Sequence, residues 1–312
     1  MRICSLLPSA TEVVFAVGLG DALVAVSHEC DFPAAVQALP KVTRSNIPKG
    51  LASCEIDQFV TAALADSGSL YALEVELLDR LAPDVIITQQ LCDVCAVATD
   101  HLQDALTGFA RKPAVVSLNA QSLQGILDDI QTAGVALGRP EQGAQIVQRL
   151  RQRIEAVEAK TRNIAYRPRV CCLEWADPPY CGGHWMSELV RIAGGRDDLA
   201  VRHRPSHRIE WQAIAAFAPE IIVLTCCGYD LERCTLEARV LARREDLRDV
   251  PALRTDAVFA TDSSSYFARP GPRIVESLEI LASIVHPELF PAPELPNAFC
   301  RVVVGERATA LA

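Results

Sequence analysis

The feature that most constrains the fold of this chain is an internal recurrence. The segment LAPDVIIT at 81–88 is echoed by FAPEIIVLT at 217–225. In both, a helix is expected to end at Ala-Pro, an acidic residue follows, and β-branched residues predict a buried strand. Arg2-Ile3-Cys4 is likewise echoed by Arg169-Val170-Cys171, and each opens a predicted strand. The repeated order predicts two similarly built lobes.

The order of predicted elements defines the fold class. In the first half, strand signals at 2–7, 22–27, 84–88 and 114–118 alternate with helical segments, and the second half ends the same plan with a strand at 257–261. Strands separated by helices pair in parallel within layered sheets. The 312 residues are long for one core and suit two. We therefore expect an α/β protein with two three-layer lobes and mainly parallel sheets.

A long helix is predicted between the two halves. Pro140 fits its first turn, and apolar residues then keep a spacing of three to four, at Ile146, Val147, Leu150, Ile154 and Val157. About 23 residues make a rod of roughly 35 Å. We expect a backbone helix at 140–165 that joins an N-terminal lobe (1–139) to a C-terminal lobe (166–312). The alternative is an ordinary surface helix of one lobe.

The N-terminus predicts a helix start and carries no secretory signal. Ser9 is expected to cap a helix, with Glu12 three residues later as in a capping box. The apolar run is only 3–7, shorter than a signal peptide needs. The expectation is a cytoplasmic chain, or a periplasmic or otherwise extracytoplasmic one if the true N-terminus is longer.

Composition excludes two classes of partner. The net charge of -9 argues against nucleic acid, and no apolar stretch is long enough for membrane insertion. Without a secretory signal, the 12 cysteines are expected to be reduced thiols rather than a disulfide framework.

Several segments together resemble a known family. They are SLLPSATEVVFAVGLGDALVAVSHECDFP (5–33), LAPDVIIT, the long helix after Pro140, AGG (193–195), FAPEIIVLT and YFARPGPRIVESLEIL (266–281). The chain resembles the helical-backbone (class III) substrate-binding proteins of ABC importers, closest to vitamin B12 (cobalamin) binding proteins. The resemblance runs from residue 2 to about 290, with an unmatched insertion near 45–75.

The resemblance implies a periplasmic-binding-protein-like fold in which two lobes on one long helix bind a bulky metal chelate between them. It implies cobalamin or a related corrinoid as ligand, no required cofactor, and a transporter permease as partner. The alternatives left open are another chelate (a siderophore or haem), a Cys/His metal site, and a thiol-dependent enzyme. No familiar catalytic signature is present, so we expect no enzyme.

Ligands of open α/β sheets lie beyond the carboxyl ends of the strands. The residues expected there in the first lobe are Ser9, Thr11, His28, Glu29, Cys30, Asp31, Arg44 and Gln90. Those in the second lobe are Glu174, Trp175, His184, Trp185, Cys227, Tyr229, Tyr266, Phe267 and Arg269. Aromatic walls suit a flat macrocycle, and the second lobe has most of them.

Individual residues suggest specific roles. The His28 imidazole is a candidate axial ligand for a chelated metal, and Arg44 and Arg269 are candidates to face anionic groups of the ligand. Arg44 and Gln90 stand where cobalamin binders of the family tend to place aromatics. Cys92 and Cys95 have metal-ligand spacing, but a zinc site needs further ligands. A Cys181–His184 pair is the candidate for thiol chemistry.

Overall fold

The computed structural model describes residues 1–65, 70–89, 99–109 and 111–303. Contacts divide the chain into two compact units, one formed by 1–120 with 124–150 and the other by 121–123 with 151–312. The long helix α6 (Pro140–Thr161) contains the division between residues 150 and 151. The division thus lies within the segment expected to connect two lobes, and each unit is described by itself.

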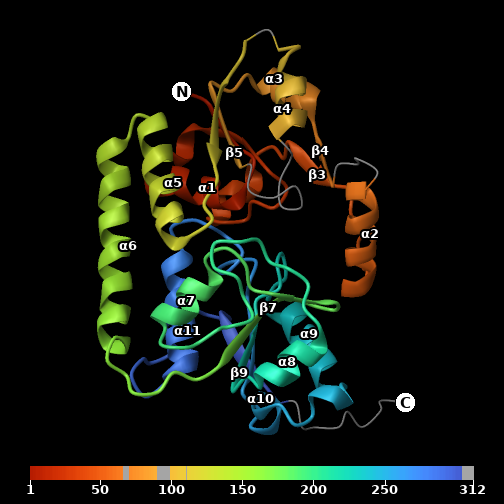
Figure 1. The fold of residues 1–312 in the computed structure, drawn as a ribbon. Helices are drawn as coiled ribbons and strands as arrows, with labels where there is room; N and C mark the ends of the chain where they lie inside the picture. Colours follow the sequence, from red (N-terminus) through yellow and green to blue (C-terminus); the bar gives the residue numbers. More distant parts are fainter. Residues whose placement is uncertain (66–69, 90–98, 110, 304–312) are drawn as a thin grey trace. The chain divides into compact units, whose positions relative to one another are not determined.

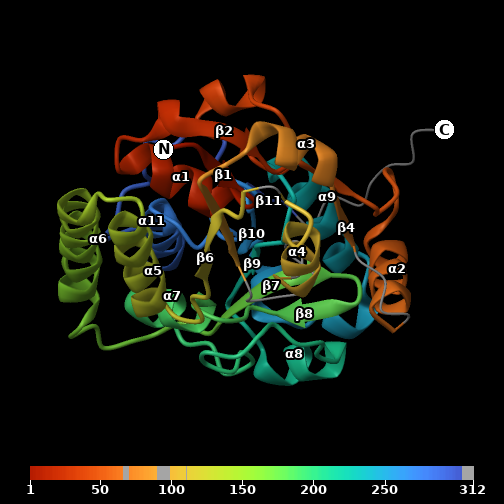
Figure 2. The same ribbon diagram turned by 90° about the horizontal axis from the view of Figure 1, so that it is seen from above.

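Unit 1 is built on a four-stranded parallel sheet in the order β2-β1-β5-β6. The strands are β1 (Ile3–Ser5), β2 (Leu23–Val26), β5 (Val85–Gln89) and β6 (Ala114–Leu118). Figures 1 and 2 show α1 (Pro8–Ala16) and α5 (Leu123–Ala136) on one side of this sheet, with α3 (Val75–Leu81) and α4 (Thr99–Leu106) on the other. Cys4 and Ile86 of the sheet pack with Leu78 and Leu102 in one buried cluster.

The unmatched insertion of unit 1 forms a small substructure. An antiparallel pair, β3 (Thr43–Ser45) and β4 (Tyr71–Leu73), brackets helix α2 (Ser53–Ala65). Short 3₁₀ turns at Gly20–Ala22 (η1) and Ala34–Ala38 (η2) flank β2.

Unit 2 is built on a five-stranded sheet in the order β11-β10-β9-β7-β8. Its strands are β7 (Val170–Ala176), β8 (Pro179–Cys181), β9 (Ile221–Leu224), β10 (Val258–Thr261) and β11 (Phe299–Val302). The three central strands are parallel, and β8 and β11 are antiparallel edges.

Helices cover both faces of this second sheet. Figures 1 and 2 show α7 (Met186–Ile192) and α11 (Ile274–Val285) on one side, and α8 (Trp211–Phe217) and α9 (Leu231–Ala242) on the other. The remaining helical elements are η3 (Glu245–Leu247) and α10 (Pro251–Arg254). Leu173 and Ile222 of the sheet pack with Ile214 of α8 and Ala238 of α9 in the core.

The predicted recurrence is also a repeat of contacts at the amino ends of the strands, with the carbonyl that accepts from the guanidinium offset by one residue between the two copies. In unit 1, the Arg2 guanidinium donates to the Leu81 carbonyl, and the Arg2 N–H donates to the Asp84 carboxylate. In unit 2, the Arg169 guanidinium donates to the Ala218 carbonyl, and the Arg169 N–H donates to the Glu220 carboxylate.

The helix before each of these acids ends in the same way. Ala82 and Ala218 both adopt the left-handed conformation, with φ of 42° and 48°, directly after helices of seven residues. Proline follows each alanine and cannot extend a helix. The sequence echo therefore reflects one structural device used twice.

The sequence predicted this architecture with one local error. The two α/β units, the parallel strands and the helix from Pro140 are confirmed, and Ile146, Val147, Leu150 and Val157 form its buried stripe. The predicted division into 1–139, 140–165 and 166–312 stays a prediction. The cap at Ser9 is wrong: α1 begins at Pro8, Leu7 precedes it, and Ser9 lies within the first turn. Proline takes the first helical position because its missing N–H has no partner there.

Candidate functional site

The candidate residues follow strands whose carboxyl ends meet at one edge in each sheet. In unit 1 most of them follow β1, β2 and β5, and Arg44 lies in β3; in unit 2 most follow β7, β9 and β10, and His184 and Trp185 follow the antiparallel strand β8. Loops at this edge are free to carry binding side chains because the sheet alone fixes the fold.

Beyond β1 and β2, unit 1 holds a buried cluster of hydroxyls and a thiol. Thr11 Oγ1 donates to Ser5 Oγ at 2.8 Å and lies 3.1 Å from Cys30 Sγ, which in turn lies 3.2 Å from Ser27 Oγ. Burial raises the pKa of Cys30, although hydrogen bonds from Ser27 and Thr11 oppose the rise. Ser9 is also buried. These side chains fix the loop, and their burial leaves little surface for direct ligand contact.

His28 is held in one orientation by Thr43. Its backbone N–H donates to Thr43 Oγ1 at 3.0 Å, and its Nδ1 lies 2.7 Å from the same oxygen. The Nε2 atom lies 3.2 Å from Glu29 Oε1, and the imidazole ring lies 5.5 Å from the Tyr71 ring. If Nδ1 donates its proton to Thr43, Nε2 keeps a lone pair, as metal-binding histidines require.

The other unit 1 candidates are charged or fall outside the described residues. Glu29 and Asp31 are exposed, and Arg44 is exposed in β3 with its Nε 3.6 Å from Glu74. Gln90, Cys92 and Cys95 lie outside the residues that the structure describes.

Unit 2 brings aromatic side chains together at the carboxyl ends of β7 and β9. The Trp175 and Tyr229 rings lie 4.9 Å apart and are tilted by 43°. The Arg233 guanidinium lies 5.0 Å from the centre of the Tyr229 ring, and the backbone of Trp175 pairs with Tyr180 of β8. Cys227 is exposed in the turn before Tyr229. The result is an aromatic platform with a cation at its end.

Glu174 acts mainly on the neighbouring loop. Its carboxylate accepts a hydrogen bond from the Gly183 N–H at 2.7 Å. Burial raises its pKa, opposed by hydrogen bonds from Gly183 and Ser206. Glu174 therefore fixes the turn after β8.

His184 and Trp185 follow that turn. His184 has a left-handed backbone (φ 51°), and its ring stacks on Trp185 at 5.6 Å. Burial lowers its pKa, and its Nδ1 is buried without a hydrogen-bond partner among the described residues. Trp185 Nε1 donates to the Phe267 carbonyl at 3.3 Å, so the loop after β10 is tied to this turn.

The loop after β10 contributes mostly buried side chains. Tyr266, Phe267 and Arg269 are exposed by 8%, 2% and 6% respectively. The Arg273 guanidinium lies 5.4 Å from the Tyr266 ring. Phe267 is therefore a packing residue, and Tyr266 has little surface for ligand contact.

The thiol chemistry considered from sequence finds a different partner. Cys181 Sγ lies 3.2 Å from Nδ1 of His207, which the sequence pattern did not single out. Burial raises the pKa of Cys181 to about 11, and a hydrogen bond with the backbone of His207 opposes the rise. A thiol so protonated at neutral pH is a poor nucleophile. No group of three metal-ligating side chains occurs among the described residues.

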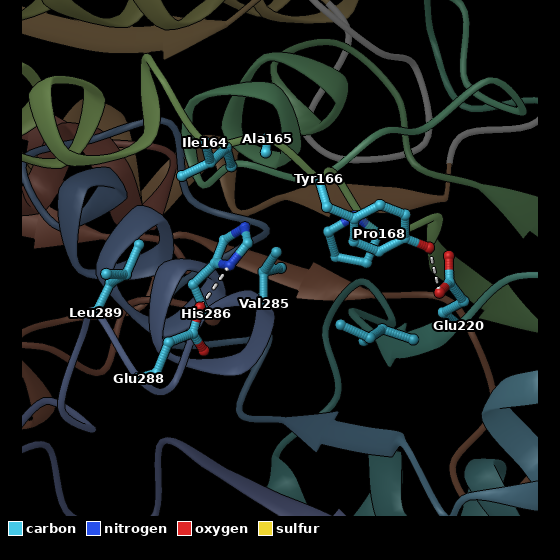
Figure 3. Close-up of a pocket in the computed structure, with 10 residues that line it drawn as sticks. Ile164, Ala165, Tyr166, Pro168, Glu220, Val285, His286, Glu288 and Leu289 are labelled. Atoms are coloured by element: carbon cyan, nitrogen blue, oxygen red, sulfur yellow. Dashed lines mark hydrogen bonds and ion pairs between the residues drawn. The ribbon is translucent and has the colours of Figure 1, made fainter.

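A pocket lies at the opposite edge of the unit 2 sheet (Figure 3). It has a volume of about 580 Å³, and Pro168 and Ile221 place it at the amino ends of β7 and β9. The Tyr166 hydroxyl donates to Glu220 at 2.5 Å, and His286 Nδ1 lies 3.0 Å from Glu288. None of the candidate site residues lines it, and of its two acids Glu220 accepts from the Arg169 N–H while Glu288 pairs with His286.

Similarity to known proteins agrees with this fold. The periplasmic binding protein family matches residues 3–265, and the chain belongs to that family. A vitamin B12-binding protein of Vibrio cholerae is 24% identical over 89% of this chain and 86% of its own. An uncharacterized ABC transporter substrate-binding lipoprotein of Bacillus subtilis is 24% identical over 93% of this chain and 81% of its own.

Solved structures are similar over most of the chain. A periplasmic heme-binding protein from Pseudomonas aeruginosa has a TM-score of 0.71 at 20% identity, with 92% of this chain and 93% of the other covered. The periplasmic vitamin B12-binding protein of Vibrio cholerae has a TM-score of 0.63 at 22% identity, covering 91% and 96%. The resemblance to class III substrate-binding proteins is thus confirmed. Within the described residues, no helix has both the length and the apolar character needed to cross a bilayer.

Proposed function

We propose that this chain is a substrate-binding component of ABC-importer type, or a relative of one, that binds a metal tetrapyrrole. A corrinoid is the first choice of ligand and haem the second. The observation that carries the proposal is the Trp175–Tyr229 pair at the carboxyl ends of β7 and β9. Aromatic walls hold a flat apolar macrocycle with few polar contacts.

His28 supports a metal-containing ligand. Its contacts to Thr43 orient the ring, and its Nε2 atom is buried without a hydrogen-bond partner among the described residues. A histidine oriented through one ring nitrogen offers the other to a metal. We propose that His28 Nε2 replaces a weak axial ligand of the bound cobalt or iron.

Relatives that are named for a ligand support the same class of molecule. Two of them are named for vitamin B12 and heme. Both ligands are tetrapyrrole-type metal chelates, so the aromatic platform and the histidine fit either one. Handing the chelate to a membrane permease belongs to the proposal, and co-purification with a permease from detergent extracts tests that part.

The test is a titration of the reduced protein with hydroxocobalamin and, separately, haemin. Tryptophan fluorescence reports occupancy, and the absorption spectrum of the chelate reports its axial ligand. We expect Trp175→Ala to weaken binding about tenfold or more, because a buried aromatic contact is a typical hot spot. His28→Ala should abolish the spectral shift and weaken binding less.

The matched control is Trp211→Ala. Trp211 begins α8, lies 4.2 Å from the Arg244 guanidinium and is not one of the candidate site residues. It should leave chelate affinity unchanged. Absence of saturable binding of either chelate at micromolar concentration would refute the proposal, and equal losses in both tryptophan variants would refute the platform.

A further inference from the structure

We propose that residues 202–208, named here the basic loop, form a subsite for anionic groups on the edge of the ligand, carboxylates or a phosphate. The loop reads Arg-His-Arg-Pro-Ser-His-Arg and lies between α7 and α8. This inference rests on the proposed function, because it assigns the polar periphery of the same ligand.

The loop concentrates positive charge in a chain whose net charge is -9. Arg202, His203, Arg204, His207 and Arg208 are all exposed. Two of them are partnered by Glu188: Arg202 at 3.9 Å and His203 at 3.2 Å. The guanidinium groups of Arg204 and Arg208 have no ion pair within the described part of the chain.

The loop is fixed against the β8 turn by its backbone. The His184 N–H donates to the Arg204 carbonyl at 2.6 Å, and the Cys181 N–H donates to the His207 carbonyl at 3.1 Å. A Cβ on Gly183 would lie 2.2 Å from the Ser206 nitrogen, so the close approach requires glycine there. A loop held this way presents its arginines at low entropic cost.

The strand pairing sets the distance between the basic loop and the aromatic platform. Trp175 pairs with Tyr180, and Tyr180 forms an isolated bridge with Arg208. Two strand spacings separate the Trp175 and Arg208 backbones by about 10 Å. A macrocycle lying on Trp175 would therefore bring its peripheral groups within reach of a long arginine side chain.

Neighbouring acids do not neutralise the free arginines. Glu174 is engaged by Gly183 and Ser206, and Glu188 by Arg202 and His203. Asp197 accepts from the Leu199 and Ala200 N–H groups. Arg204 and Arg208 remain to bind carboxylate or phosphate oxygens, which match the planar guanidinium.

The experiment compares ligands that differ only in the anionic group. Haemin is paired with its dimethyl ester, and cobinamide phosphate with cobinamide. The variant is Arg204→Gln/Arg208→Gln, and the control is Arg248→Gln/Arg254→Gln. The control arginines are also exposed, and removing them changes the net charge equally. Circular dichroism establishes that both variants are folded.

We expect the loop variant to weaken binding of the anionic ligand about three- to tenfold, with little effect on its neutral partner. Haemin alone responding assigns carboxylates, and cobinamide phosphate alone responding assigns phosphate. Equal affinity of the loop variant and wild type for both anionic ligands would overturn the inference while leaving the proposed function intact. Equal losses for charged and neutral ligands would overturn it as well. If wild type binds none of the four, the proposed function itself fails.

Discussion

The sheets of the two units carry the same contacts at the amino ends of their strands and different side chains at the carboxyl ends. At the amino ends of the strands, Arg2 with Asp84 and Arg169 with Glu220 make the same contacts. At the carboxyl ends, unit 1 has buried hydroxyls and the Cys30 thiol, whereas unit 2 has the aromatic platform and the basic loop.

This difference separates residues that specify the fold from residues available for binding. The arginine–acid contacts join the end of a helix, the start of a strand and the neighbouring strand. They stabilise the fold whichever ligand is bound. The carboxyl ends carry side chains with no common structural task. Unit 2 accordingly offers the larger share of proposed ligand contacts.

The glycines that follow α1 and α7 differ in how tightly the surrounding residues pack against them. Gly18 and Gly194 both have positive φ, 78° and 91°. A Cβ on Gly18 meets no atom within 4 Å, whereas one on Gly194 would lie 2.7 Å from the His286 ring. We expect Gly18→Ala to cost about 1 kcal/mol and Gly194→Ala about 3 kcal/mol, since the clash adds to the backbone strain.

Urea denaturation of each variant measures this difference. The His286→Ala background is the control: removing the ring should lower the cost of Gly194→Ala, but not to that of Gly18→Ala, because Ile164 Cδ1 would still lie 2.8 Å from the added Cβ. Equal costs for the two glycines in the wild-type background would show that the His286 contact has no energetic weight.

Each unit also contains one aspartate that burial makes a weak acid. Burial raises the pKa of Asp129 in unit 1 and of Asp197 in unit 2 to about 6, against opposing backbone hydrogen bonds. Asp197 Oδ1 accepts two N–H groups, and its Oδ2 is buried without a partner among the described residues. Asp129 accepts from Ala120 at 2.9 Å.

The folded state holds these protons more tightly than the unfolded state, whose aspartates titrate near 3.9. Wild-type stability should therefore fall as pH rises from about 4 to about 6. Asp197→Asn keeps the Oδ1 acceptor but cannot ionise, so its free energy of unfolding should not fall in this way. Relative to wild type, the variant should gain about 1–3 kcal/mol of stability between pH 4 and pH 7. Asp129→Asn should gain a similar amount, because its pKa is raised to the same value. Urea midpoints at pH 4, 5, 6 and 7 measure both, and a gap that does not change with pH would contradict the assignment.

The fold was predictable because its signals are local and repeated. Ala-Pro-acid before a β-branched run occurs twice, and each copy forms the predicted helix end and strand start. The error at Ser9 arose because Pro8 and Ser9 are both typical of helix starts, and the position of proline decided between them.

The candidate site was less predictable because it depends on contacts distant in sequence. The Trp175–Tyr229 pair joins the ends of two strands, and both members were singled out without their contact. The importance of His207 and Arg208 depends on their pairing with β8, although the basic run at 202–208 was visible in the sequence. Burial of Phe267 and Arg269 likewise depends on packing that a linear pattern does not encode.

The smallest effects are expected from variants of the two acids at the amino ends of the strands, where the units are alike. Asp84→Asn and Glu220→Gln each remove the charge that faces a backbone N–H and a nearby arginine. Each should cost about 0.5–1 kcal/mol at pH 7, because these contacts are partly exposed.

The pH dependence distinguishes the charge of Glu220 from simple packing. Burial acts to raise the Glu220 pKa, but hydrogen bonds from Tyr166 and Arg169 outweigh it, and the pKa lies below the usual value. A carboxylate with a lowered pKa stabilises the fold above its unfolded pKa, and this stabilisation is lost as pH falls through the folded pKa. The difference between wild type and Glu220→Gln should therefore shrink from pH 6 to pH 3. If it persists at pH 3, the contacts at the amino ends are held by hydrogen-bond geometry alone, and the likeness of the two units does not depend on the charge of their acids.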